Sequence, residues 1–83
     1  MEIIQIEEQL VGYFKQNTDT IVDSKTLLLE EKIIDSMGVI ELVAFIEATY
    51  GVELTDDDLT VDNFKDIDTI VKLISEKKGT QPL

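Results

Sequence analysis

Asp35 and Ser36 stand together just before a run of apolar residues, and they are the residues of this chain best placed to do chemistry. A nucleophilic serine needs a base, usually His, within hydrogen-bonding reach. The 83 residues include no His and no Cys, and no serine lies in a Gly-x-Ser-x-Gly sequence. Ser36 is therefore poorly suited to attack a substrate, although an enzyme could attach a group to it, and we expect that this protein is not itself an enzyme.

A simpler interpretation is that one of these two residues only caps a helix. Asp and Ser are both favoured at the N-cap position, although Gly38 and Val39, three residues after them, complete no capping box. Attachment of a phosphate ester to Ser36 has separate support, because free amide groups and the positive end of a helix dipole stabilise a phosphate. Gly38 would leave the backbone beside the serine uncluttered for a large group. From these residues alone, capping is the favoured interpretation.

The elements that position Ser36 belong to one small domain. Hydrophobic residues make up 43% of the sequence, which is enough for a packed core. Helical spacing of these residues predicts helices over residues 2–16, 36–50 and 66–78, and turn and capping residues predict a short third helix over 56–59, which makes four. Residues 21–34 should form a long connection whose apolar residues are held against the core. Gly51 should end the second helix, and Thr55 with Asp58 should form a capping box at the third. The expected fold is an all-α, four-helix bundle over residues 1–79, with a frayed tail at 80–83.

The charge of the chain limits its partners. Eighteen Asp and Glu residues against seven Lys residues give a net charge of −11. Such a charge repels phosphate backbones and anionic lipid surfaces, so we expect no nucleic-acid binding and no stable membrane insertion. Basic patches on other proteins are the expected partners. The N-terminus lacks a signal-peptide pattern and no segment reaches transmembrane length, so we expect a cytoplasmic monomer.

The second predicted helix carries two apolar stripes at helical spacing. The stripe that suits the core comprises Val39, Leu42, Val43, Ile46 and Tyr50. The other comprises Met37, Ile40 and Ala44, with Glu41 and Glu47 at its border. A domain of this size can bury only one stripe well. The second is therefore either an exposed docking surface or packed under the long first loop.

Taken in order, these features resemble acyl carrier proteins over nearly the whole chain. Asp35-Ser36 at the helix start is followed by Glu41-Leu42-Val43, and the helix exits through Gly51-Val52-Glu53-Leu54. Residues 62–70 read Asp-Asn-Phe-x-x-Ile-x-Thr-Ile. An Asp-Ser pair alone is weak evidence, whereas the shared register along the chain is strong.

The resemblance implies a role for each site residue. Ser36 would carry a 4′-phosphopantetheine arm from coenzyme A, whose thiol holds an acyl group as a thioester. Asp35 would help to present Ser36 to a phosphopantetheinyl transferase, and the magnesium ion that assists belongs to that partner, so no metal site is expected here. Contacts with acyl- or aminoacyl-loading ligases, synthases and transferases would be made by Met37, Ile40, Glu41, Ala44 and Glu47. The residues lining the bundle would be Val39, Leu42, Ile46, Tyr50, Leu54, Phe64, Ile67, Ile70 and Ile74.

Two departures from the fatty-acid carriers suggest a specialised carrier. Met37-Gly38 stands where those often have Leu and an acid, and Ala48-Thr49 follows Glu47 where they carry further acids. Asp-Ser-Met-Gly is similar to D-alanyl carrier proteins, so the expected load is an unusual acyl chain of specialised lipid or secondary metabolism, or an amino acid. A cofactor-free acidic helical adaptor is the remaining alternative. Calcium-binding loops starting at Asp19 or Asp56 are excluded, because both lack the glycine required at position six.

Overall fold

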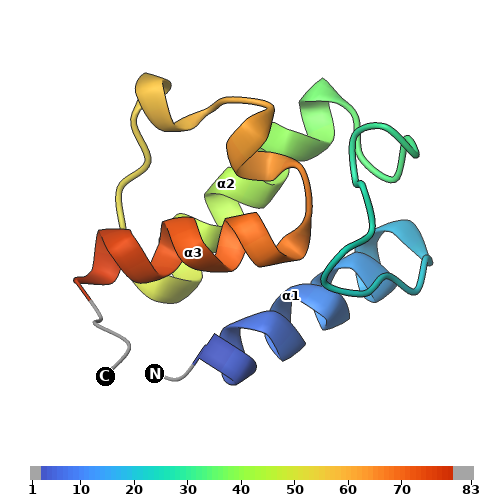
Figure 1. Cartoon of the computed structure of the whole chain (residues 1–83), viewed down its shortest axis with the longest axis horizontal. Coiled ribbons are helices and arrows are strands. Elements are labelled where there is room, and N and C mark those ends of the chain that lie inside the picture. Colours follow the sequence, from blue (N-terminus) through green and yellow to red (C-terminus); the bar gives the residue numbers. More distant parts are fainter. Residues whose placement is uncertain (1–2, 80–83) are drawn as a thin grey trace.

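The computed structural model describes residues 3–79, which form three α-helices and two short 3-10 turns (Figure 1). The elements are α1 (Ile3–Thr18), α2 (Ser36–Tyr50), η1 (Asp56–Asp58), η2 (Asp62–Phe64) and α3 (Ile67–Lys78). No strand occurs within the described range, so the predicted all-α class is confirmed. None of the helices between residues 3 and 79 combines the length and apolar character needed to cross a bilayer. The predicted tail at 80–83 lies outside the described residues.

The predicted four-helix bundle is wrong in its helix count, because the third predicted helix is only a 3-10 turn. The capping box predicted there is present, and Asp58 Oδ2 accepts hydrogen bonds from the Thr55 amide at 2.8 Å and the Thr55 hydroxyl at 3.0 Å. At Leu59 the backbone leaves the helical conformation, with φ −86° and ψ 67°. Three consecutive Asp residues are weak helix formers, and one capped turn does not repay the cost of helix nucleation.

The ends of the two later helices follow from their caps. Helix α2 begins and ends where the sequence predicts, and Gly51 closes it in the left-handed conformation, with φ 67° and its amide donating to Glu47 O at 3.0 Å. Helix α3 begins one residue later than predicted, because Asp66 is its N-cap and accepts from the Thr69 amide at 2.9 Å. The local residues therefore fix where Ser36 falls relative to its helix.

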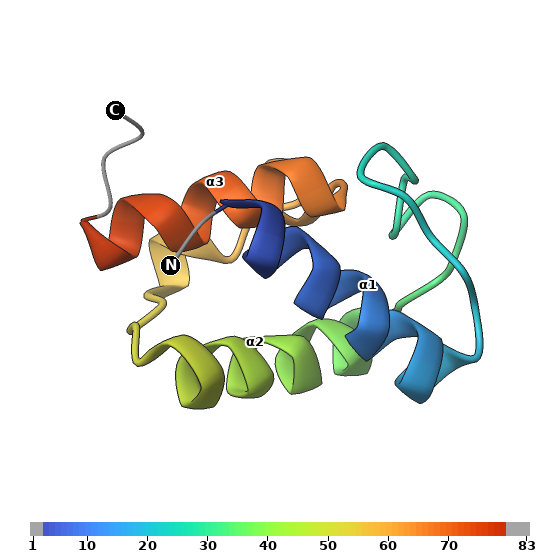
Figure 2. The same cartoon turned by 90° about the horizontal axis from the view of Figure 1, so that it is seen from below.

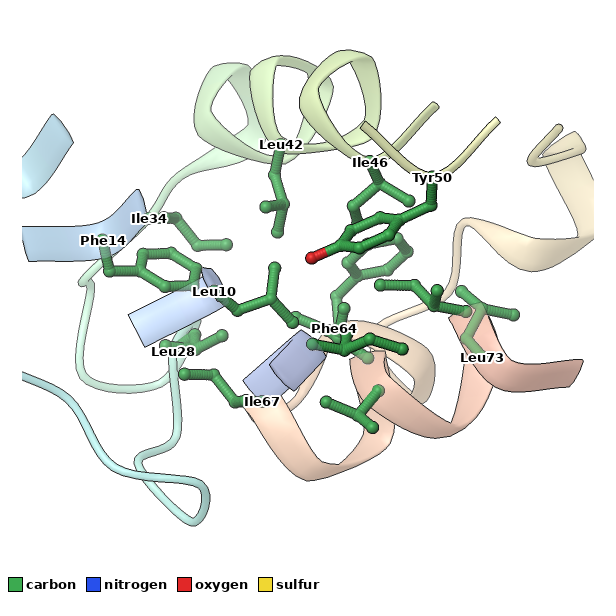
Figure 3. Close-up of a cluster of buried hydrophobic side chains, with 14 of the residues drawn as sticks. Leu10, Phe14, Leu28, Ile34, Leu42, Ile46, Tyr50, Phe64, Ile67 and Leu73 are labelled. Carbon is green, nitrogen blue, oxygen red and sulfur yellow. The ribbon is translucent and has the colours of Figure 1, made fainter. Parts of the chain in front are cut away.

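The three helices share one core (Figure 2). Helices α2 and α3 run in the same direction, and α1 runs against them at an oblique angle. Side chains from the three helices, from η2 and from the first loop meet between the helices, as Figure 3 shows for fourteen of the buried residues. Of the nine residues expected to line the bundle, seven are buried, whereas Val39 and Leu54 are only partly buried.

The long first loop, residues 19–35, is held against the bundle as predicted. Leu28 is fully buried, and its amide donates to Lys65 O at 2.9 Å. The Asp68 amide donates to Ser24 O at 3.1 Å, and Lys25 Nζ pairs with the Asp68 carboxylate at 3.0 Å. These contacts anchor the segment that leads into Ser36 to the start of α3.

Candidate functional site

Ser36 is the first residue of α2, and its side chain is exposed. The other two serines of the chain, both within the described range, are less accessible: Ser24 is half-buried and Ser75 is buried. The Ser36 hydroxyl makes no hydrogen bond to any group within residues 3–79. The hydroxyl is thus accessible and takes no part in the hydrogen bonding of the described residues.

Asp35, not Ser36, caps the helix. Its backbone is extended, with φ −112° and ψ −169°, and its Oδ1 accepts a hydrogen bond from the Gly38 amide at 2.8 Å. The sequence left open which residue of the pair caps the helix. Because Asp35 is the cap, Ser36 is not needed for capping and its hydroxyl is free for attachment.

Two amide groups beside Ser36 remain available to an anion. The first main-chain bond of the helix runs from the Val39 amide to Asp35 O at 2.9 Å, and the Gly38 amide is used by the Asp35 carboxylate. The amides of Ser36 and Met37 have no acceptor within residues 3–79. They lie at the positive end of the α2 dipole, where a phosphate oxygen would be stabilised.

Gly38 lies in a more crowded place than the sequence suggested. A Cβ atom at this position would stand 3.0 Å from Ile34 Cβ and 3.4 Å from both Asp35 Oδ1 and Ile34 Cγ2. The expectation that Gly38 leaves an uncluttered backbone is therefore wrong on the side that faces Ile34 and the cap.

A pocket of about 240 Å³ opens beside Ser36, between the first half of α2 and the segment around η2. Its lining is formed by Leu29, Ser36, Val39, Leu59, Thr60, Val61 and Phe64. Most of these side chains are apolar, and one of them, Phe64, is also buried in the core. The pocket gives an apolar group attached near Ser36 a place to lie.

The η1 turn next to that pocket is tied to the far end of α3. Lys77 Nζ forms an ion pair with Asp58 Oδ2 at 2.7 Å, and Asn63 Nδ2 donates to Asp58 O at 2.8 Å. The hydrogen bond from Lys77, followed by that from the Thr55 amide, lowers the pKa of the Asp58 carboxyl below its ordinary value. Lys78 Nζ also donates to Tyr50 O at 3.1 Å, which links the ends of α2 and α3.

The second apolar stripe of α2 is exposed. Met37 is 64% and Ile40 is 62% exposed, and Ala44 is exposed as well. The alternative that this stripe packs under the first loop is therefore wrong. These three side chains form, with the exposed Glu41, a surface that we call the α2 face.

The two acids at the border of the α2 face differ in their surroundings. Glu41 is exposed, and its charge adds to the larger effect of burial in raising the pKa of the Tyr13 hydroxyl on α1. Glu47 is half-buried, and its Oε2 accepts a hydrogen bond from the Leu54 amide at 3.0 Å. Glu47 thus stabilises the turn after α2 through a hydrogen bond that the sequence does not predict.

Comparison with known proteins identifies the family. A family model described as "Phosphopantetheine attachment site" matches residues 5–74. The acyl carrier proteins of Rickettsia massiliae, Rickettsia conorii and Rickettsia prowazekii are each 31% identical over 78 residues, covering 90% of this chain and 88% of the relative. The chain belongs to the acyl carrier protein family. Its prosthetic group is accordingly a covalently attached 4′-phosphopantetheine, which carries acyl groups.

The residues of this carrier around Ser36 fit such a group. The exposed hydroxyl would form the phosphodiester, and the unused amides of Ser36 and Met37 would face its oxygens. The apolar pocket at Ser36 would receive the methyl-bearing part of the arm. When bound, the arm supplies the thiol that holds the acyl group, so the carrier needs no Cys of its own.

Three features of the carrier's site escaped the sequence analysis. The pocket depends on Leu59 and Val61, which lie more than twenty residues after Ser36. The tie between Asp58 and Lys77 joins η1 to α3, and the crowding at Gly38 depends on how the first loop folds back. Among the residues involved, only Lys77 and Lys78 could be noticed from the sequence, because cations favour the negative end of a helix dipole.

Proposed function

We propose that this protein is a non-catalytic carrier whose phosphopantetheine arm is attached to Ser36. The observation that carries the proposal is the exposed, unbonded Ser36 hydroxyl at the first residue of α2, beside two amides without acceptors in the described chain. Asp35 supports the site through its hydrogen bond to Gly38, which fixes the first turn and presents the serine to the phosphopantetheinyl transferase.

We further propose that the α2 face is where partner enzymes dock. Exposed Met37, Ile40 and Ala44 supply a small apolar contact, and Glu41 supplies charge for Lys or Arg on an acyl- or aminoacyl-loading ligase, a synthase or a transferase. Such an interface is small, which suits a carrier that must leave each enzyme after every step. Glu47 belongs to this face by position, although its carboxylate is already bonded to the Leu54 amide.

The proposed load belongs to a specialised pathway rather than to housekeeping fatty-acid synthesis. Helix α2 carries two acids and no Lys in fifteen residues, and Ala48-Thr49 follow Glu47 where fatty-acid carriers often have further acids. The Asp-Ser-Met-Gly sequence at positions 35–38 favours an aminoacyl load, D-alanyl included, as the second candidate. The carrier is proposed to act as a cytoplasmic monomer.

Intact-mass measurement tests the attachment. The purified protein is incubated with coenzyme A, Mg²⁺ and a permissive phosphopantetheinyl transferase, beside Ser36→Ala and the matched control Ser24→Ala. We expect the mass of one phosphopantetheine on the wild type and on Ser24→Ala, and none on Ser36→Ala. An unmodified wild type, in a reaction that modifies a known carrier, would contradict the proposal and favour the cofactor-free adaptor.

A further inference from the structure

Gly38 occupies a helical position that its own conformational preference does not explain. It is the third residue of α2, and glycine is among the poorest helix formers. Its backbone is not left-handed, since the glycines with positive φ in the described chain are Gly51 and Gly79. The reason for glycine at this position must therefore lie in its surroundings.

The surroundings leave no room for a side chain. The atom nearest to a Cβ at position 38 would be Ile34 Cβ, at 3.0 Å, a separation tighter than ordinary van der Waals contact. This neighbour is not the end of a flexible side chain but the atom next to the Ile34 backbone. A residue with a Cβ at position 38 therefore requires a displacement of a few tenths of an ångström in one of the two segments.

Ile34 is held on two sides and has little freedom to retreat. Its side chain is buried and points into the core beside Phe14 and Leu42 (Figure 3). Its amide donates to Leu28 O at 3.2 Å, and the Ile33 amide donates to the same oxygen at 2.8 Å. Since close-packed cores resist such shifts, the exposed first turn of α2 is the segment that must move.

We propose that Gly38 is a positioning residue for Ser36. Without a Cβ at position 38, the first turn of α2 lies against Ile34 while Asp35 Oδ1 keeps its 2.8 Å bond to the Gly38 amide. Ser36 lies between Asp35 and Gly38 in the chain, so the position of its hydroxyl depends on the contact of the first turn with Ile34. The inference rests on the proposed attachment at Ser36. It gives a reason, in the transfer reaction, for a glycine at a helical position where helix propensity disfavours it.

The test compares two glycine-to-alanine variants in the transferase reaction. Gly12→Ala is the matched control, because Gly12 also lies inside a helix and a Cβ there would meet nothing within 4 Å. We expect Gly12→Ala to be modified as fast as the wild type. Since a misplacement of ~1 Å costs roughly a hundredfold in rate, a shift of a few tenths of an ångström in Gly38→Ala should lower kcat by about fivefold, with KM changed by less than about twofold.

A rescue variant separates positioning from loss of structure. Ile34→Val removes the terminal methyl of Ile34 and gives its Cβ room to move inward, so Gly38→Ala/Ile34→Val should recover most of the lost kcat relative to Ile34→Val alone. Circular dichroism during heating verifies that each variant is folded. Should Gly38→Ala alone not fold, the double variant is compared with Ile34→Val, and a further loss of kcat, smaller than fivefold, is expected.

Three results would overturn the inference. The first is a kcat of Gly38→Ala equal to that of the wild type. Where Gly38→Ala does not fold, the corresponding result is a kcat of Gly38→Ala/Ile34→Val equal to that of Ile34→Val. The second is a raised KM with unchanged kcat, which would mean that glycine admits the transferase rather than positions the serine. The third is a rate lost in Gly38→Ala that Ile34→Val does not restore. A wild type that accepts no arm would instead refute the proposed function.

Discussion

Removal of the α2 cap and removal of the Ser36 hydroxyl should have very different effects on stability. Asp35 Oδ1 accepts a charge-assisted hydrogen bond of 2.8 Å from the Gly38 amide. Loss of a side-chain N-cap costs typically about 1 kcal/mol, and loss of a negative charge at a helix N-terminus about 0.5 kcal/mol more. Asp35→Ala should thus destabilise the fold by about 1.5 kcal/mol.

The corresponding change in melting temperature is large enough to measure. An unfolding entropy of about 2.1 cal/mol/K per residue gives about 0.17 kcal/mol/K for 83 residues, so Asp35→Ala should lower Tm by about 9 °C. Asp35→Asn keeps a capping oxygen and should lose only the charge contribution, about 3 °C. Ser36→Ala removes a hydroxyl that bonds to nothing in the described chain, and alanine is the better helix former, so its Tm should stay within about 3 °C of the wild type.

Circular dichroism at 222 nm, recorded at neutral pH during reversible heating, measures all three variants. The order expected is Ser36→Ala close to the wild type, Asp35→Asn slightly lower and Asp35→Ala lowest. A Ser36→Ala variant that melts as early as Asp35→Ala would refute the reasoning, because the hydroxyl would then hold the helix start and would not be free for attachment.

Three further predictions concern the α2 face, the tie at η1 and the core. Glu41→Lys should slow loading by a cognate enzyme at low salt, and Glu76→Lys on α3, with the same charge change, should not; equal rates for both would contradict the docking role. The pKa of Asp58 is lower in the folded than in the unfolded state, so its ion pair with Lys77 stabilises the fold only while Asp58 is charged. Lys77→Met should therefore be less stable than the wild type above about pH 4, and this difference should disappear as the pH falls through the folded-state pKa. Urea unfolding at several pH values measures the difference, and a difference that persisted in acid would contradict the ion pair. Ser75→Ala should raise the free energy of unfolding by about 1 kcal/mol, since the buried Ser75 hydroxyl lacks a partner in the described structure, and a lower Tm would show that it has one.

The sequence predicted the elements whose limits are set by neighbouring residues. Helix α2 begins after an Asp and ends at a glycine in the left-handed conformation, and both signals lie within a few residues of the helix end. The apolar stripe at positions 67, 70, 71 and 74 likewise marked the buried side of α3. Ser36 could be singled out because its motif and helix start coincide.

The features that could not be predicted depend on segments far apart in the chain. The capping box at Thr55 also occurs in a single 3-10 turn, so a capping box does not fix the length of a helix. The bond between Glu47 and the Leu54 amide depends on how the chain turns after Gly51. The crowding of Gly38 depends on Ile34 being drawn into the core by the first loop, which no local pattern reveals.

Peptide mapping of the modified protein tests the central claim most directly. Trypsin cleaves after Lys32 and Lys65, and the resulting peptide of residues 33–65 contains Ser36 as its only serine, whereas Ser24 and Ser75 fall in other peptides. After reaction with coenzyme A and a transferase, fragmentation of the peptides should place one phosphopantetheine on Ser36. The arm on any other residue, or on none while a known carrier is modified in parallel, would contradict the assignment of Ser36 as the attachment site.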